Sequence, residues 1–294
     1  MVERKTYRLS GGMFDREAET SDVKRLFFLS VEGVSTEPSY FRNLNRVLKD
    51  LGVKNIMLHV LKHPNDGLSS PEDVYALLEE CRDLRSGGGL LPVPVIEGLK
   101  DEFGEDEIRA YLEGGCIEQD KVRKLRDILL NLGVNMTYRK FIQSAPSSED
   151  RFVVVIDRDS RSHSRRCIED VMSKCKEKGF VFCLTNPCFE FWLLLHLVDA
   201  EGLQDHDEMD RIAANEKVSV KHTYVSKRVS DIARHAKRIP AHTFDRLYKP
   251  NISKAINSSG CFAATAEAVI ESPGSTMPLL MSDILHDSQI SEAI

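Results

Sequence analysis

The sequence lacks the features of a secreted, zinc-binding or membrane protein. Its seven cysteines are odd in number and include no C-x-x-C pair, so neither a disulfide framework nor a structural zinc site is supported. No apolar run approaches the roughly 20 residues of a membrane span. The N-terminal residues contain no apolar core like that of a signal peptide. We therefore expect a cytoplasmic protein with reduced thiols and no membrane contact.

The net charge of −6 does not indicate nucleic-acid binding, but the charge is unevenly distributed. Residues 97–120 hold nine acids against two bases, and residues 215–256 hold ten lysines and arginines against three acids. Sign asymmetry of this kind indicates either separate surfaces for separate partners or two solvated helix faces.

Four short apolar segments alternate with helical patterns along the chain. The segments RLFFLSVEG (25–33), NIMLHVLKH (55–63), RFVVVID (151–157) and FVFCLT (180–185) are each typical of a buried strand. Strands that are apolar on both faces and alternate with helices form parallel sheets that helices cover on both sides. The sequence thus predicts an α/β fold with a mostly parallel four-stranded sheet.

The predicted domain organisation places an α/β domain between two less regular parts. It comprises a loose N-terminal arm (1–22), the α/β domain (23–200), an acidic insertion in that domain (about 86–120), and a small helical C-terminal region (201–294) that carries the basic stretch 215–256. We expect no further strand after about residue 200 and a fraying tail beyond about residue 275.

Carboxylates follow two of the predicted strands. Glu32 ends the first strand and precedes Gly33, which permits a tight turn, and Asp157 and Asp159 end the third. In a parallel sheet these strand ends meet at one edge, where ligands of α/β proteins bind. Mg²⁺, or Mn²⁺ in its place, would relieve the repulsion among the three acids. The alternative is an Asp-rich turn with no ligand.

A fourth carboxylate stands in the predicted helix of TNPCFEFWLLLH (185–196). This helix is apolar nearly all round, which is typical of a buried helix, yet it contains Glu190. Asn186 can cap the helix and Pro187 suits its first turn. Glu190 is then either a further metal ligand at the same sheet edge or a buried acid paired with a neighbouring arginine.

Basic residues cluster close to the acids. Guanidinium groups suit phosphate recognition, and the basic stretch could hold a nucleic-acid backbone. His163 could protonate a leaving oxygen or lie in a loop near phosphate. The candidate phosphate contacts are Arg42, Arg158, Arg161, Arg165, Lys227 and Arg228. His196, Trp192 and Cys188 are expected to be buried core residues.

Three motifs in this order resemble the RloB-like family, a branch related to the Toprim fold. They are VEGVSTEPSYF (31–41), VIDRDSR (155–161) and TNPCFEFWLLLH (185–196). The resemblance implies that Glu32 matches the Toprim glutamate and that Asp157 and Asp159 match its metal-binding pair. It also marks a set of positions typical of the RloB-like branch: Thr36, Glu37, Pro38, Tyr40, Phe41, Asn186, Pro187, Glu190 and His196.

The resemblance implies a Mg²⁺-dependent nuclease, an effector of anti-phage defence by abortive infection that works with an ATPase partner. Glu32, Asp157 and Asp159 would be catalytic, and these three with Glu190 would hold the metal. The substrate would be DNA or RNA, with tRNA among the candidates, and a homo-oligomer is left open. The alternative is a non-catalytic or conditionally active subunit that binds nucleic acid or a partner. A receiver-like phospho-acceptor domain fits the element order but not the late Asp-x-Asp.

Overall fold

The chain divides into two compact units. The computed structural model describes residues 25–62, 70–145 and 149–285, so the predicted N-terminal arm lies outside the described residues. The smaller unit consists mainly of residues 79–145, and the larger unit of residues 25–61, 70–78 and 149–285. The predicted acidic insertion falls within the smaller unit.

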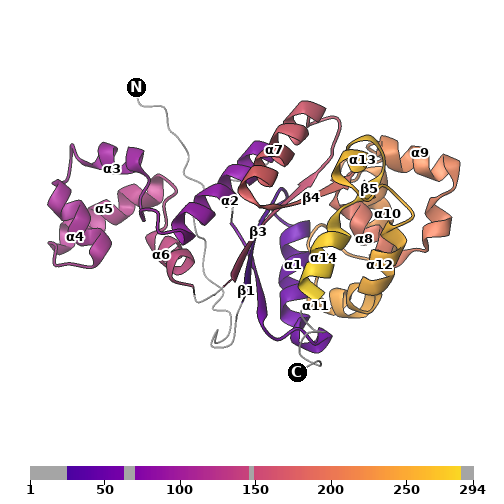
Figure 1. Ribbon diagram of the computed structural model, residues 1–294, viewed down its shortest axis with the longest axis horizontal. Coiled ribbons are helices and arrows are strands. Elements are labelled where there is room, and N and C mark those ends of the chain that lie inside the picture. Colours follow the sequence, from indigo (N-terminus) through magenta and orange to yellow (C-terminus); the bar gives the residue numbers. More distant parts are fainter. Residues whose placement is uncertain (1–24, 63–69, 146–148, 286–294) are drawn as a thin grey trace. The chain divides into compact units, whose positions relative to one another are not determined.

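A five-stranded sheet forms the centre of the larger unit (Figure 1). Its order is β2-β1-β3-β4-β5, with β1 to β4 parallel and β5 antiparallel to β4. The strands are β1 (Arg25–Val31), β2 (Ile56–Val60), β3 (Glu149–Asp157), β4 (Val181–Asn186) and β5 (Gly274–Ser275). The α/β class and the mostly parallel sheet are confirmed.

The predicted count of four strands is wrong, because β5 adds a fifth. Two residues are too short for a hydrophobic period, so β5 carries no local signal. Its place depends on partners far away in the chain: the amide of Thr276 donates to the carbonyl of Leu184 at 3.0 Å, and the hydroxyls of Thr185 and Ser275 lie 2.8 Å apart.

Helices connect the strands and form the C-terminal region. Those that connect strands are α1 (Thr36–Val47), α2 (Pro71–Arg85) and α7 (Arg165–Lys178). After β4 come α8 (Phe189–Leu197), α9 (His206–Ala214), α10 (Tyr224–Ala233), α11 (Ala241–Thr243), a π-helical turn (Phe244–Tyr248), α12 (Ile252–Ser259), α13 (Ala266–Glu271) and α14 (Met277–Leu285). Within the described ranges, no helix has both the length and the apolar composition needed to cross a membrane.

Both faces of the sheet are buried, as the continuous apolar strands require. On one face Phe28 stacks on Phe152, and Phe180 packs against both Phe152 and Tyr75 of α2. On the other face alternate residues of β1 and β3 join the core with α1, α8 and α14. Figure 1 shows α2 and α7 on one side of the sheet and α1 and α14 on the other.

The region after residue 275 is folded as far as the structure describes it. In α14 the side chains of Met277, Leu280, Met281 and Ile284 are fully buried in the main core. The expected fraying is therefore wrong for residues 277–285. Burial of four large apolar side chains stabilises this helix by several kcal/mol, at about 1.5–3 kcal/mol for each side chain.

The smaller unit has a core of its own. Four helices build it: α3 (Val93–Leu99), α4 (Glu105–Glu113), α5 (Gln119–Asn131) and α6 (Met136–Ser144). The core consists of Leu91, Val95, Leu99, Phe103, Ile108, Leu125, Leu129 and Val134. Apolar residues of the acidic stretch thus face inward, while acids such as Glu97 and Glu107 pair with Lys100 and Lys121 at the surface.

Candidate active site

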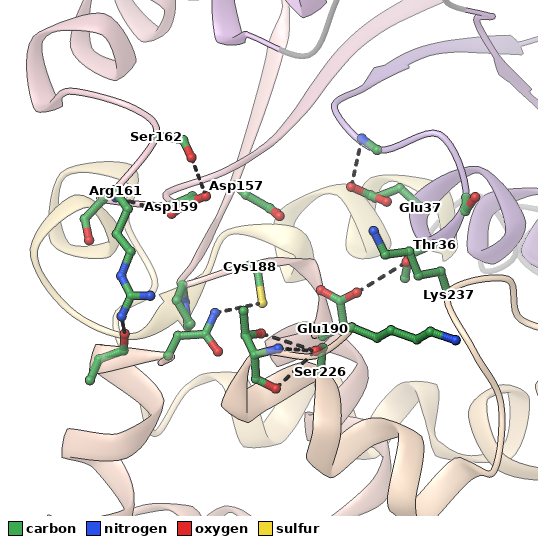
Figure 2. Close-up of a pocket in the computed structure, with 18 of the residues that line it drawn as sticks. Thr36, Glu37, Asp157, Asp159, Arg161, Ser162, Cys188, Glu190, Ser226 and Lys237 are labelled. Carbon is green, nitrogen blue, oxygen red and sulfur yellow. Dashed lines mark hydrogen bonds between the residues drawn. The ribbon is translucent and has the colours of Figure 1, made fainter. Parts of the chain in front are cut away.

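A pocket of about 440 Å³ opens at the carboxyl ends of β1, β3 and β4 (Figure 2). The strand ends are level there, because Val31 pairs with Val155 and Asp157 pairs with Thr185. Four segments line the pocket: residues 33–37 after β1, residues 157 and 159–162 at the end of β3, residues 187–190 at the start of α8 in part, and part of residues 213–237. The pocket therefore occupies the edge that the sequence predicts for a ligand site.

Glu32 is held by two contacts beside this pocket. One carboxylate oxygen, Oε2, accepts the backbone N–H of Asp157 at 3.0 Å, and Oε1 lies 3.0 Å from Nε2 of His163. The hydrogen bond to Glu32 is the largest cause of a raised pKa at His163, whose side chain is buried. His163 is therefore a direct partner of the first carboxylate, although it follows Glu32 by 131 residues.

Glu37 contributes a carboxylate that sequence reasoning placed only among family-typical positions. Its side chain is buried, and Oε1 accepts the backbone N–H of Gly33 at 3.0 Å. Burial, together with the negative charge of Glu190, raises the pKa of Glu37 to about 7. A Cβ atom at Gly33 would lie 2.2 Å from Oε2 of Glu37, so only glycine leaves room for this carboxylate.

Asp157 stands at the centre of the acidic group. Its pKa is raised well above the usual value, first by desolvation and then by the charges of Glu32, Glu37 and Glu190. Charges from the segment directly after β1, from α1 and from α8 therefore all act on the carboxylate at the end of β3. Figure 2 shows Asp157 and Glu37 on opposite sides of the pocket, with Glu190 on α8.

Glu190 lies in the first turn of α8 and accepts the hydroxyl of Thr36 at 3.3 Å. The alternative interpretation of Glu190, a buried acid paired with an arginine, predicts a guanidinium at this carboxylate. The structure places the hydroxyl of Thr36 there. The local capping differs from the expectation: Asn186 ends β4 and Cys188 occupies the N-cap position. Asn186 instead donates from Nδ2 to the carbonyl of Val269 at 2.7 Å, because tertiary packing brings α13 beside β4.

Asp159 is both a turn residue and a pocket residue. Its carboxylate accepts the Ser162 hydroxyl at 2.8 Å and the backbone N–H of Arg161 at 3.3 Å. Its carbonyl accepts the backbone N–H groups of Ser162 and His163, both at 2.9 Å. The turn thus orients the loop that brings His163 to Glu32, while Asp159 still lines the pocket.

Of the predicted phosphate contacts, Arg161 alone lines the pocket among the described residues. Its guanidinium donates to the carbonyl of Ala214 at 2.8 Å. Arg158 donates to the carbonyls of Ile270 and His163 at 2.9 and 3.0 Å, so it ties the loop to α13. Arg158 therefore holds the loop after β3 against α13.

The other predicted phosphate contacts lie outside the pocket lining. Arg165 pairs with Glu169 and Glu271, Lys227 with Asp231, and Arg228 with Glu208. Arg42 is exposed on α1. The structure instead brings Lys221 and Lys237 to the pocket. Both belong to the basic stretch, but their positions in the sequence do not distinguish them from their paired neighbours.

Two residues of α8 belong to the buried interior, as expected. His196 and Trp192 are fully buried, and Nδ1 of His196 lies 3.0 Å from the carbonyl of Trp192. Burial lowers the pKa of His196 to about 4, so the ring is neutral at pH 7. Cys188 lines the pocket, and burial raises the pKa of its thiol.

The acidic group matches the ligand chemistry of a hard divalent cation. In the part of the chain that the structure describes, no three His, Cys, Asp or Glu side chains surround a common point closely enough to form a complete metal site. Mg²⁺ needs no such cage, because it usually binds one or two carboxylates and completes its shell with water and substrate phosphate. Desolvation and the neighbouring carboxylates raise the pKa values of Asp157 and Glu37, and a bound cation would favour their ionised forms.

A family model described as RloB-like protein matches residues 27–284, which is nearly the whole chain. The match includes both β1 with its following glutamate and the pocket segments of β3 and α8. No curated protein and no solved structure matches the chain.

Proposed function

This chain belongs to the RloB-like family, and from that premise and the acidic pocket we propose that it is a Mg²⁺-dependent nuclease that hydrolyses phosphodiester bonds. One observation carries the proposal: four carboxylates gather at the carboxyl edge of a parallel sheet, where Glu37, Asp157 and Glu190 line the pocket and Glu32 accepts the backbone N–H of Asp157 beside it. In the biological role that we propose, the protein is an effector of anti-phage defence that works with an ATPase partner.

We assign the sheet to the Toprim type. The support is that a glutamate follows β1, an Asp-x-Asp follows β3, and these two strands are parallel neighbours in the sheet. The backbone N–H of Asp157 donates to Glu32, which ties the two acidic segments together at 3.0 Å. A carboxylate site built from two chain segments requires adjacent parallel strands whose acids meet at one edge of the sheet.

In this proposal Asp157 and Glu190 hold the metal, with Asp159 and Glu37 close by in the pocket lining. When bound, Mg²⁺ or Mn²⁺ would polarise the phosphoryl oxygens and offset the charge that develops on them. Arg161 orients the phosphate from the rim, because its guanidinium is fixed by the carbonyl of Ala214.

Glu32 and His163 form the acid–base pair of the proposed site. Nε2 of His163 lies 3.0 Å from Oε1 of Glu32, which is within the reach of proton transfer. Because Oε2 of Glu32 accepts the backbone N–H of Asp157, the pair stays next to the acid assigned to the metal. Glu32 thus serves as the general acid or base, and His163 positions it.

A second candidate function is a conditionally active subunit that becomes a nuclease only within a complex. The observation that favours it is the incomplete arrangement of the acids, since no three ligating side chains within the described residues surround one point. In this candidate, a partner or the nucleic acid draws the acids together.

Cleavage of labelled DNA and RNA tests both candidates. Wild type, Asp157→Asn and Glu32→Gln are incubated with Mg²⁺, with Mn²⁺ or with EDTA, alone and with any ATPase that copurifies. Glu177→Gln, an exposed acid on α7, is the matched control for loss of one negative charge. We expect Asp157→Asn and Glu32→Gln to reduce cleavage by about 100-fold or more, and Glu177→Gln to cleave like wild type.

Three outcomes separate the candidates. Cleavage by the isolated chain supports the nuclease, and cleavage only in the presence of the ATPase supports the conditional subunit. Absence of cleavage with every metal, alone and in the complex, contradicts both. Cleavage that Asp157→Asn and Glu32→Gln leave unchanged contradicts the assignment of the site.

A further inference from the structure

Residues 216–223 form a tight hairpin between α9 and α10 that the proposed chemistry does not use. Lys217 and Thr223 form an antiparallel bridge, and the backbone N–H groups of Val218 and Ser219 donate to the carbonyl of His222 at 3.0 and 3.1 Å. The Ser219 hydroxyl accepts the backbone N–H groups of Lys221 and His222 at 3.3 and 3.1 Å. These bonds fix the turn in one shape.

The hairpin is also anchored at its base. The side chain of Asn215 accepts the backbone N–H of Val225 at 3.0 Å, and the backbone N–H of Tyr224 donates to the carbonyl of Glu216 at 2.8 Å. Nδ2 of Asn215 lies 3.6 Å from the sulfur of Cys188 at the pocket wall. The hairpin therefore projects from a fixed point beside the acids.

The tip of the hairpin exposes apolar side chains to solvent. Val220 is 91% exposed and Val218 is 50% exposed. Lys217 and Lys221 flank them on the same turn and are exposed too. A single exposed valine is ordinary. Two valines between lysines on a fixed turn provide a surface for a ligand that is both apolar and anionic.

The same hairpin reaches the pocket. Lys221 and Thr223 line it, and Lys237 lines it from the segment after α10. Figure 2 shows Lys237 on the same side of the pocket as Thr36 and Glu190. In the described part of the chain neither Lys221 nor Lys237 forms an ion pair, whereas Lys227 pairs with Asp231. These two ammonium groups therefore remain available for phosphate.

We propose that the hairpin binds an unpaired nucleic-acid strand and guides it into the pocket, with Lys221 and Lys237 on its phosphates and Val220 against its bases. The inference rests on the proposed nuclease function and adds the class of substrate. In a duplex each base is stacked on its neighbours, so no base face is accessible to the side chain of Val220. In a single strand or loop the base faces are accessible to side chains.

Binding to fluorescein-labelled probes tests the hairpin without cleavage. Anisotropy is measured in EDTA with single strands of about 12 nucleotides, of DNA and of RNA, and with the matching duplexes. The variants are Val220→Ser, which keeps the charge, and Lys221→Gln. The matched controls are Val93→Ser at another exposed valine and Lys176→Gln at an exposed lysine of α7.

We expect Val220→Ser to weaken binding of single strands by about three- to tenfold, since part of one valine contact is lost, and to leave duplex binding unchanged. Lys221→Gln weakens binding of both single strands and duplexes. It also reduces the slope of log binding constant against log salt concentration by about 1, the amount expected for one lost phosphate contact. The controls bind like wild type. Equal melting temperatures for all variants show that the fold is intact.

The inference is overturned if Val220→Ser binds single strands like wild type, if it loses duplex binding equally, or if wild type binds no single strand. It is also overturned if a protein that copurifies with wild type no longer copurifies with Val220→Ser while nucleic-acid binding is unchanged, because the hairpin would then bind a protein. Cleavage by wild type and its loss in Asp157→Asn decide the nuclease function separately, so failure of the hairpin leaves that result intact.

Discussion

The side chains of His163, in the loop between β3 and α7, and Glu32, directly after β1, meet at 3.0 Å. The contact links the loop after β3 to the end of β1. It depends on the turn at Asp159, whose carbonyl accepts the backbone N–H of His163 at 2.9 Å. The contact between His163 and Glu32 is therefore tied to the Asp-x-Asp segment.

Replacement of His163 tests whether this contact positions Glu32. We expect His163→Ala to reduce metal-dependent cleavage by about 10- to 100-fold, the usual cost of removing an outer partner of a metal site. His163→Gln can still donate an N–H to the carboxylate, so it should restore part of the rate and keep the wild-type pH profile. Rates measured across pH for the three proteins check this; equal losses in both variants would contradict a positioning role.

Neutralising Asp157 should stabilise the protein when metal is absent. Desolvation and three neighbouring carboxylates raise the pKa of Asp157, so its ionised form destabilises the fold at pH 8. We expect Asp157→Asn to raise the Tm in EDTA, at about 2–4 °C for each kcal/mol relieved. Mg²⁺ should raise the Tm of wild type more than that of Asp157→Asn. Differential scanning fluorimetry measures both Tm differences. Glu177→Gln is the control, and its Tm in EDTA and its Tm increase with Mg²⁺ should both match those of wild type.

The pH dependence of stability should carry a contribution from Glu37. Its pKa is about 7 in the folded chain and 4.5 when unperturbed. Below pH 4.5 the group is protonated in both states and has no effect. As the pH rises from 4.5 to 7, the unfolded state loses its proton first, so folding becomes less favourable, by on the order of 3 kcal/mol at most.

Metal-free wild type should therefore lose stability between pH 4.5 and 7 more steeply than Glu37→Gln. Chemical denaturation in EDTA at several pH values measures the difference. Parallel stability curves for the two proteins would show that Glu37 titrates normally in the folded state.

Glycine at position 33 should be required for the acidic site more than for the fold. Any Cβ there would lie 2.2 Å from Oε2 of Glu37, so Gly33→Ala must displace that buried carboxylate. We expect cleavage to fall by about tenfold or more, because small displacements of site groups reduce rates strongly. Gly98→Ala is the control, since its Cβ would meet no atom within 4 Å. An unchanged rate in Gly33→Ala would show that Glu37 does not contribute to catalysis.

Much of the larger unit could be predicted from local patterns. Each parallel strand is a continuous apolar run, and the helices between them show their own periods and stops. β5 could not be predicted, because two residues carry no period and their pairing with β4 joins segments far apart in the chain. The folded α14 was also missed, since its stability comes from burial against distant core residues.

The acids and the bases of the site differ in how far sequence could place them. Glu32, Asp157 and Asp159 follow predicted strands, so the parallel topology places them at one edge. Arg165 and Arg228 have carboxylate partners, Glu271 and Glu208, that only the folded chain supplies, whereas Lys227 pairs with Asp231 four residues on in the same helix. Their availability for phosphate therefore could not be read from a count of basic residues.

The sequence by itself determined the alternating α/β order and the carboxylates at the ends of β1 and β3, because strand periodicity and the residues that end a strand are local properties. Only the tertiary structure decided that Glu37 joins the acids, that His163 holds Glu32, and that Lys221 and Lys237 face the pocket. The physical reason is distance along the chain. Desolvation and side-chain hydrogen bonding depend on neighbours such as Thr36 and Glu190, which are 154 residues apart in sequence and 3.3 Å apart in the fold.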